Sequence, residues 1–193
     1  MSNAIEIEAK ALVSKADYEK LALKYKKYGA YIQVNHYIDS ADGILSKEKL
    51  ALRIREKDNH FEMTLKVPLS QGLLEKNCTW NKETFIRFRD CGIFPDGDIK
   101  KMLNMLDIDT KSLKIITSLT TERIDVPYQN GKLSIDKNTY SGLDDYEIEL
   151  EHNNEGDAEK YLKQLFEEND IPYVLNKKSK VVRAMEAYRA GKK

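Results

Sequence analysis

The sequence is poor in the residues that mark secreted, zinc-thiolate and membrane-spanning proteins. Only two cysteines occur, Cys78 and Cys91, and they do not form a Cys-x-x-Cys pair, so neither a disulfide framework nor a zinc-thiolate site is indicated. No apolar run approaches the roughly 20 residues that a membrane-spanning helix needs. The N-terminus also lacks the apolar run of a signal peptide. These absences predict a soluble protein of the reducing cytoplasm.

An excess of charge of one sign is lacking as well. Lysine plus arginine and aspartate plus glutamate both total 32, although charged residues make up 33% of the 193 residues. Because the net charge is zero, nothing indicates nucleic acid or a membrane as a partner. Any electrostatic function must come from local clusters of positive and of negative side chains. The apolar content of 41% suits one domain over residues 1–193. Monomer and homodimer both stay open.

Several segments alternate apolar and polar side chains with the period of a β-strand. Strands are predicted at residues 5–12, 31–39, 50–56, 61–67, 113–126, 132–136 and 145–151. The dipeptide Asn130-Gly131 predicts a hairpin turn that brings Arg123 close to Asp136. Helical spacing predicts helices after Ser14 and around 158–166, and a mainly helical insert around 79–111.

The charges are sorted between these strands. Glutamate takes every second position in two of them, whereas Arg53 and Arg55 alternate in a third. A polar sheet face is commonly exposed to water, and a charged face of that kind implies no special function. However, like charges two residues apart on a strand repel one another unless counter-ions lie between them. The sorting therefore favours a face that binds charged ligands.

A closed antiparallel β-barrel with helices outside would accommodate this sorting, because its interior could be lined with charge. Six acidic and six basic residues are candidates for the interior: Glu6, Glu8, Asp136, Glu147, Glu149 and Glu151, with Lys10, Arg53, Arg55, Lys66, Arg123 and Lys180. A triphosphate carries roughly four to five negative charges, and two divalent cations would offset most of them. Carboxylates suit Mg²⁺ or Mn²⁺, whereas arginine and lysine suit phosphate.

An ordered set of motifs resembles the CYTH, or triphosphate tunnel metalloenzyme, family. The first is Glu6-Ile7-Glu8-Ala9-Lys10, which is similar to the family's ExExK signature. The others follow in order along nearly the whole chain: Asn35–Asp39, Leu52–Arg55, Thr64–Lys66, Thr121–Arg123, Leu133–Lys137 and Asp145–Glu151.

The resemblance implies an eight-stranded antiparallel tunnel of the α+β class that binds a small-molecule triphosphate with Mg²⁺ or Mn²⁺. It implies metal binding by the six acidic residues named above. Substrate binding is implied for Lys10, Arg53, Arg55, Lys66, Arg123 and Lys180, with Lys178 as the second choice for the late lysine and Lys177 also a candidate. Among these, Lys10, Arg55 and Lys66 are expected to stabilise charge in catalysis.

The resemblance leaves three functions to separate. Metal-dependent hydrolysis of tripolyphosphate, thiamine triphosphate or a nucleoside triphosphate is the first expectation. A class IV adenylate cyclase would instead form cyclic AMP and pyrophosphate from ATP, and the sequence shows no recognisable adenine pocket for it. A non-catalytic polyphosphate- or nucleotide-binding module is the third. His36 lies on the apolar side of its strand and is expected to be structural.

Overall fold

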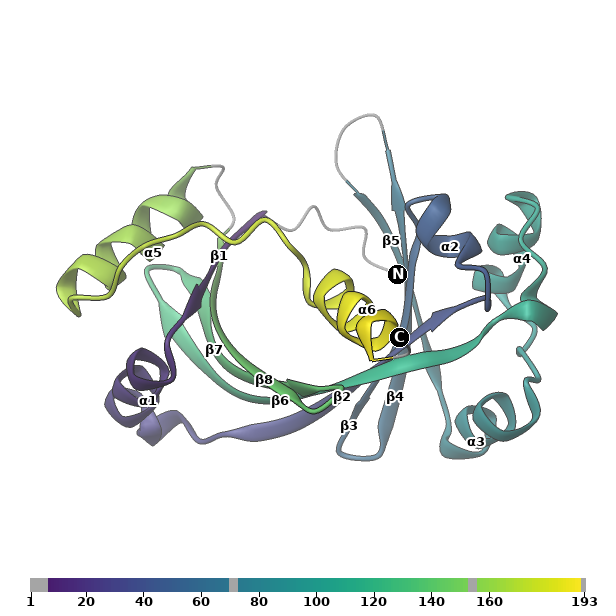
Figure 1. Cartoon of the computed structure of the whole chain (residues 1–193), viewed down its shortest axis with the longest axis horizontal. Helices are drawn as coiled ribbons and strands as arrows, with labels where there is room; N and C mark the ends of the chain where they lie inside the picture. Colours follow the sequence, from purple (N-terminus) through teal and green to yellow (C-terminus); the bar gives the residue numbers. More distant parts are fainter. Residues whose placement is uncertain (1–6, 70–72, 153–155, 192–193) are drawn as a thin grey trace. The chain divides into compact units, whose positions relative to one another are not determined.

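The computed structural model describes residues 7–69, 73–152 and 156–191 (Figure 1). Its strands are β1 (Ile7–Val13), β2 (Tyr31–Asp39), β3 (Ala51–Lys57), β4 (His60–Pro68), β5 (Leu73–Trp80), β6 (Lys114–Tyr128), β7 (Gly131–Tyr140) and β8 (Leu143–His152). Its helices are α1 (Lys15–Lys24), α2 (Ile44–Lys47), α3 (Lys82–Cys91), α4 (Asp98–Met105), α5 (Asp157–Glu168) and α6 (Lys180–Ala190), with short 3₁₀ turns η1 (Lys26–Tyr28) and η2 (Thr110–Ser112).

The strands form one eight-stranded sheet in the order β1-β8-β7-β6-β2-β3-β4-β5. The registered ladders are antiparallel, from β1 with β8 to β4 with β5. The predicted α+β class with eight antiparallel strands is therefore confirmed. Among the described residues, the order is open, with β1 and β5 at its two ends. The closed barrel is not confirmed and stays a prediction.

The described chain divides into two compact units. Unit 1 comprises residues 34–119 and 184–191, and unit 2 comprises residues 7–33 and 120–183. The long strands β2 and β6 contribute residues to both units, and so does α6. The single domain expected from the sequence stays a prediction.

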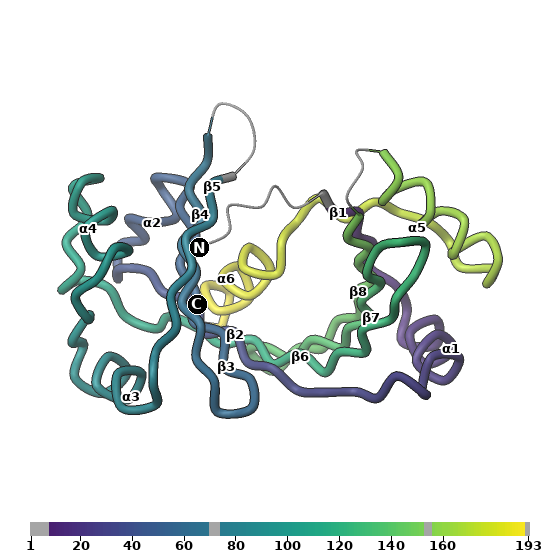
Figure 2. Tube along the Cα trace, turned by 180° about the vertical axis from the view of Figure 1, so that it is seen from behind, coloured from purple at the N-terminus to yellow at the C-terminus, as the bar shows by residue number. Residues whose placement is uncertain are grey.

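Unit 2 builds its core on one face of β1, β7 and β8. Helices α1 and α5 pack against these strands, which can be followed in the trace of Figure 2. Ala9 and Ala11 of β1 join Ile148 and Leu150 of β8 in this core, all with exposures of 4% or less. Strand alternation then directs the intervening polar residues of the same strands to the other face.

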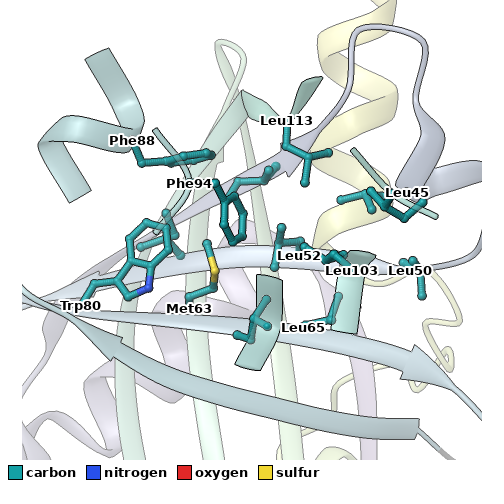
Figure 3. Packing of buried hydrophobic residues seen from close by; sticks show 14 of the residues in the cluster. Leu45, Leu50, Leu52, Met63, Leu65, Trp80, Phe88, Phe94, Leu103 and Leu113 are labelled. Atoms are coloured by element: carbon teal, nitrogen blue, oxygen red, sulfur yellow. The ribbon is translucent and has the colours of Figure 1, made fainter. Parts of the chain in front are cut away.

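Unit 1 builds a separate core between β3, β4 and the helices α3 and α4. Leu52, Met63 and Leu65 from the strands pack with Phe88 and Leu103 from the helices (Figure 3). The predicted split of β3, with Leu52 and Ile54 buried and the arginines on the opposite face, is confirmed.

The hairpin between β6 and β7 forms one residue earlier than the Asn130-Gly131 dipeptide suggested. Gln129 and Asn130 take the two positive φ angles, 50° and 60°, while Gly131 already pairs with Tyr128. A Cβ at Gly131 would lie 2.3 Å from the carbonyl oxygen of Glu151. Glycine is therefore required there by the close approach of β8, not by the turn.

Two further features compare directly with the sequence expectations. Strand β5 was not predicted, and the helices α3 and α4 lie in the range expected to be helical. His36 is half-buried, with Nδ1 2.8 Å from Ser118 Oγ and Nε2 3.2 Å from Glu56 Oε2, which agrees with a structural role.

Within the described ranges, no helix has the length and apolar character that a bilayer crossing requires.

Candidate active site

Three buried carboxylates meet on the polar face of unit 2. Register places Asp136 of β7 directly opposite Glu147 of β8, and Glu149 follows two residues later on the same face. One oxygen from each carboxylate lies within 4.8 Å of the other two. The exposures of Asp136 and Glu147 are 0%, and that of Glu149 is 8%, so this acidic trio is almost completely removed from water.

Arg123 of β6 neutralises one side of the acidic trio. The β6–β7 register puts it opposite Asp136, as predicted, and it forms a bidentate pair with N–O distances of 2.7 and 2.6 Å. Its Nη2 also donates to Glu149 at 2.7 Å. Burial would lower the pKa of Arg123, but the carboxylates of Asp136 and Glu149 outweigh it and raise that pKa.

Lys180 neutralises the centre of the acidic trio. It is the first residue of α6, and its Nζ lies 2.9 Å from Asp136 Oδ2 and 2.5 Å from both Glu147 Oε2 and Glu149 Oε1. Burial would lower the pKa of Lys180, but the three carboxylates raise it. Conversely, burial would raise the pKa of Glu149, and Lys180 with Arg123 holds it well below its ordinary value.

Lys178, the second choice for the late lysine, takes part through its backbone. Its N–H donates to Asn176 Oδ1 at 3.0 Å, and its carbonyl accepts from Arg183 Nη1 at 2.9 Å. Of the three candidate lysines, Lys180 is the one whose ammonium the structure places against the acidic trio.

Two residues of this network were missed by the sequence reasoning. Arg183 bonds Glu147 through Nη1 and Nη2, both at 3.0 Å, and Asp145 through Nε at 2.8 Å. Asn176 donates from Nδ2 to Glu147 Oε1 at 2.8 Å. Arg183 stands one helical turn after Lys180, a spacing that would have placed both on one helix face. No sequence pattern marks Asn176, because a tertiary contact sets its position: its backbone N–H donates to the carbonyl oxygen of Lys10.

The remaining acidic candidates lie outside the trio. Register pairs Lys10 with Glu149 and Glu8 with Glu151, on the polar face. Lys10 Nζ contacts Glu8 Oε1 at 2.5 Å, and Lys132 Nζ contacts Glu151 Oε2 at 2.8 Å. The Glu8 and Glu151 side chains are about one-third exposed, at 33% and 32%. Glu6 lies outside the described residues.

The basic candidates Arg53, Arg55 and Lys66 lie together on the polar face of unit 1. The β3–β4 register pairs Arg53 with Thr64 and Arg55 with Glu62. Arg55 Nε donates to Asn35 Oδ1 at 3.4 Å, and Lys66 forms an ion pair with Glu75 of β5. Glu75 was not expected, because the strand that carries it was not predicted.

The donor set of the acidic trio fits a hard divalent cation. Carboxylate oxygens are the ligands that Mg²⁺ and Mn²⁺ prefer, and three of them converge here. Ammonium and guanidinium groups now supply the positive charge that these buried carboxylates require. Asp136, Glu147 and Glu149 are accordingly the residues that could hold a metal ion.

Comparison with known proteins agrees with the family motifs of the sequence. The profile of the CYTH domain matches residues 4–185. The chain is 32% identical over 193 residues to "Putative triphosphatase YjbK" of Bacillus subtilis (strain 168), with 98% of both proteins covered.

Solved structures give the same result. A "putative adenylate cyclase" from Bacillus halodurans is 36% identical, with a TM-score of 0.86 over 95% of this chain and 98% of that one. HpAC1 from Hippeastrum, at 20% identity and a TM-score of 0.75 over 96% of each chain, shares the fold. The family profile and the B. subtilis relative together show that the chain belongs to the CYTH domain family.

Proposed function

We propose that this protein hydrolyses a small triphosphate compound with the help of Mg²⁺ or Mn²⁺. The observation that carries the proposal is the buried trio of Asp136, Glu147 and Glu149 in a chain of the CYTH family. A triphosphatase name on the B. subtilis relative, at 32% identity over the whole chain, supports hydrolysis as the reaction class.

The chain's own residues divide the work by charge. Asp136, Glu147 and Glu149 would hold the cation, which when bound supplies Lewis-acid polarisation of phosphoryl oxygens and activation of the attacking water. Arg123 stays bidentate to Asp136 and so keeps that carboxylate oriented.

Four basic residues are proposed to bind the phosphate chain. Guanidinium forks match phosphate oxygens, so Arg53 and Arg55 are proposed to orient the substrate. Lys66 and Lys10 would add point charges where negative charge spreads in the transition state. The partly exposed carboxylates of Glu8 and Glu151 remain proposed ligands for a second cation, together with Glu6.

An adenylate cyclase is the second candidate, because the similar B. halodurans structure carries that name. The two reactions give different products. Incubation with tripolyphosphate, thiamine triphosphate and ATP, each with Mg²⁺ or Mn²⁺, should release orthophosphate from at least one substrate. Cyclic AMP with pyrophosphate from ATP would establish the cyclase instead.

A matched variant separates intrinsic activity from contamination in this assay. Glu149→Gln purified in parallel should release no orthophosphate above background, because an amide of the same size replaces a carboxylate of the trio. If the wild type binds tripolyphosphate but turns over none of the three substrates with either metal, the protein is a binding module and the hydrolase proposal is wrong.

A further inference from the structure

Two neighbouring residues of unit 1 carry buried polar atoms that lack a hydrogen-bond partner. Among the described residues, these atoms are Arg53 Nε and Thr64 Oγ1, and the only other one is the hydroxyl of Tyr173 in unit 2. Arg53 and Thr64 are directly opposed in the β3–β4 ladder. Side chains of opposed residues project from the same face of a sheet, so the two unsatisfied donors lie side by side.

The Thr64 hydroxyl is costly to the free protein. Thr64 is 1% exposed, and a buried hydroxyl without a partner destabilises the fold, whereas a valine of the same shape would not. Thr121 of unit 2 shows the usual solution, since its equally buried hydroxyl donates to Asn138 Oδ1 at 2.8 Å. A hydroxyl left unsatisfied beside an unsatisfied guanidinium N–H indicates that an acceptor from outside the chain completes the pair.

The surroundings define the chemistry of that acceptor. Lys66 lies two residues after Thr64 on the same face of β4. Arg55 lies two residues after Arg53 on the adjoining strand β3, again on this face. On β4 and β5, this face carries the acidic groups Glu62 and Glu75, opposite Arg55 and Lys66 respectively. Arg53 and Thr64, by contrast, face each other with no carboxylate as cross-strand partner. One oxygen that accepts two hydrogen bonds would satisfy both atoms at once.

We propose that Thr64 is a substrate-binding residue whose hydroxyl, together with Arg53 Nε, donates to one phosphoryl oxygen of the triphosphate. This inference rests on the proposed function, because it names a further contact to the same substrate. An anionic oxygen accepts both hydrogen bonds at once and is held more strongly than a neutral acceptor. The Thr64 hydroxyl sits on a short side chain and fixes the position of the phosphoryl oxygen, whereas the long lysine side chains do not.

The test compares Thr64→Val, Thr64→Ser and the control Thr121→Val with the wild type. Calorimetric titration with tripolyphosphate in excess chelator measures binding without turnover, and thermal melting measures stability. Thr64→Val should melt at or above the wild-type temperature. It should also bind tripolyphosphate at least about tenfold more weakly, as expected for the loss of a hydrogen bond to a charged group. Thr64→Ser should bind within about threefold of the wild type, and Thr121→Val should melt at a lower temperature.

Each other outcome overturns the inference. Unchanged tripolyphosphate affinity in Thr64→Val would show that the hydroxyl does not contact phosphate. A melting temperature lowered as much as in Thr121→Val would show that the hydroxyl is satisfied in the free protein, for example by an ordered water. If the wild type binds tripolyphosphate neither in chelator nor with Mn²⁺, the proposed function fails along with this inference. Wild-type binding that Thr64→Val leaves unchanged overturns the Thr64 contact alone.

Discussion

Replacing Lys180 with methionine should destabilise the free protein and strengthen its binding of a divalent cation. The ammonium lies within 2.9 Å of all three carboxylates of the acidic trio, and methionine keeps most of the side chain's length without its charge. After the change, the ion pairs of the trio that remain among the described residues are those with Arg123 and Arg183, and Arg183 is shared with Asp145.

The size of the effect follows from burial. Removing one partner of a buried ion pair costs about 3–5 kcal/mol, and we take about 3 kcal/mol because two arginines remain. For a chain of this length, 1 kcal/mol shifts the melting temperature by about 2–4 °C, so Lys180→Met should melt about 6–12 °C below the wild type in chelator. A cation at a hundredfold excess over its Kd stabilises the folded protein by about 2.7 kcal/mol, which offsets most of that loss.

The assay is thermal melting in chelator and across a Mn²⁺ titration, with calorimetry to obtain the Mn²⁺ affinity. Lys177→Met is the matched control, because Lys177 is an exposed lysine three residues before Lys180, and this variant should melt within about 2 °C of the wild type. Mn²⁺ should raise the melting temperature of Lys180→Met more than that of the wild type, whose own ammonium competes for the carboxylates. Equal shifts in the two proteins would refute the reasoning that metal and Lys180 share one position.

Three further predictions test other parts of the site. Glu8→Gln and Glu149→Gln should each lower tripolyphosphate turnover by at least roughly 10²-fold while the fold survives, because each loses a proposed metal ligand; wild-type rates and Mn²⁺ affinities in both would contradict the metal assignment. Arg55→Ala should weaken calorimetric binding of a non-hydrolysable triphosphate more than Arg87→Ala on α3, and equal effects would remove the case for the polar strand face as the binding surface. Burial lowers the pKa of His36 below its ordinary value, although the hydrogen bond and charge of Glu56 partly oppose this and Arg89 adds to it. The unfolded chain therefore binds that proton more tightly, and stability should fall as pH drops through about 6.5 and below; melting curves of His36→Gln should show a shallower fall, and identical slopes would exclude His36 as the cause.

The sequence predicted those parts of the fold in which a residue's neighbours along the chain decide its environment. Alternation correctly assigned the buried and polar faces of β3, because a strand reverses its side chains at every residue. The same rule, with one tight turn between β6 and β7, was enough to place Arg123 opposite Asp136. A turn error of one residue did no harm, since the register is set by both strands.

The parts that were missed depend on contacts between distant segments. Strand β5 has Lys76 among its apolar positions, opposite Leu65 of β4, so its alternation is interrupted and its strand form depends on pairing with β4. The last helix predicted from the sequence lies around 158–166, so the start of α6 at Lys180 was also missed. Arg183 and Asn176 consequently escaped notice, because only the folded chain brings them to Glu147.

The acidic trio also changes what the charge sorting means. From the sequence, glutamates at alternate positions looked like repelling charges that await external counter-ions. In unit 2, the repulsion between Glu147 and Glu149 is already offset by Arg123, Lys180 and Arg183 in the free protein. A cation that enters the trio must therefore exchange with an internal ion pair, and the ammonium it releases needs a new anionic partner. A triphosphate supplies that partner and a neutral ligand does not, so binding of metal and of polyanion should be mutually favourable. Reciprocity then requires that tripolyphosphate raise the Mn²⁺ affinity by the same factor as Mn²⁺ raises the affinity for tripolyphosphate.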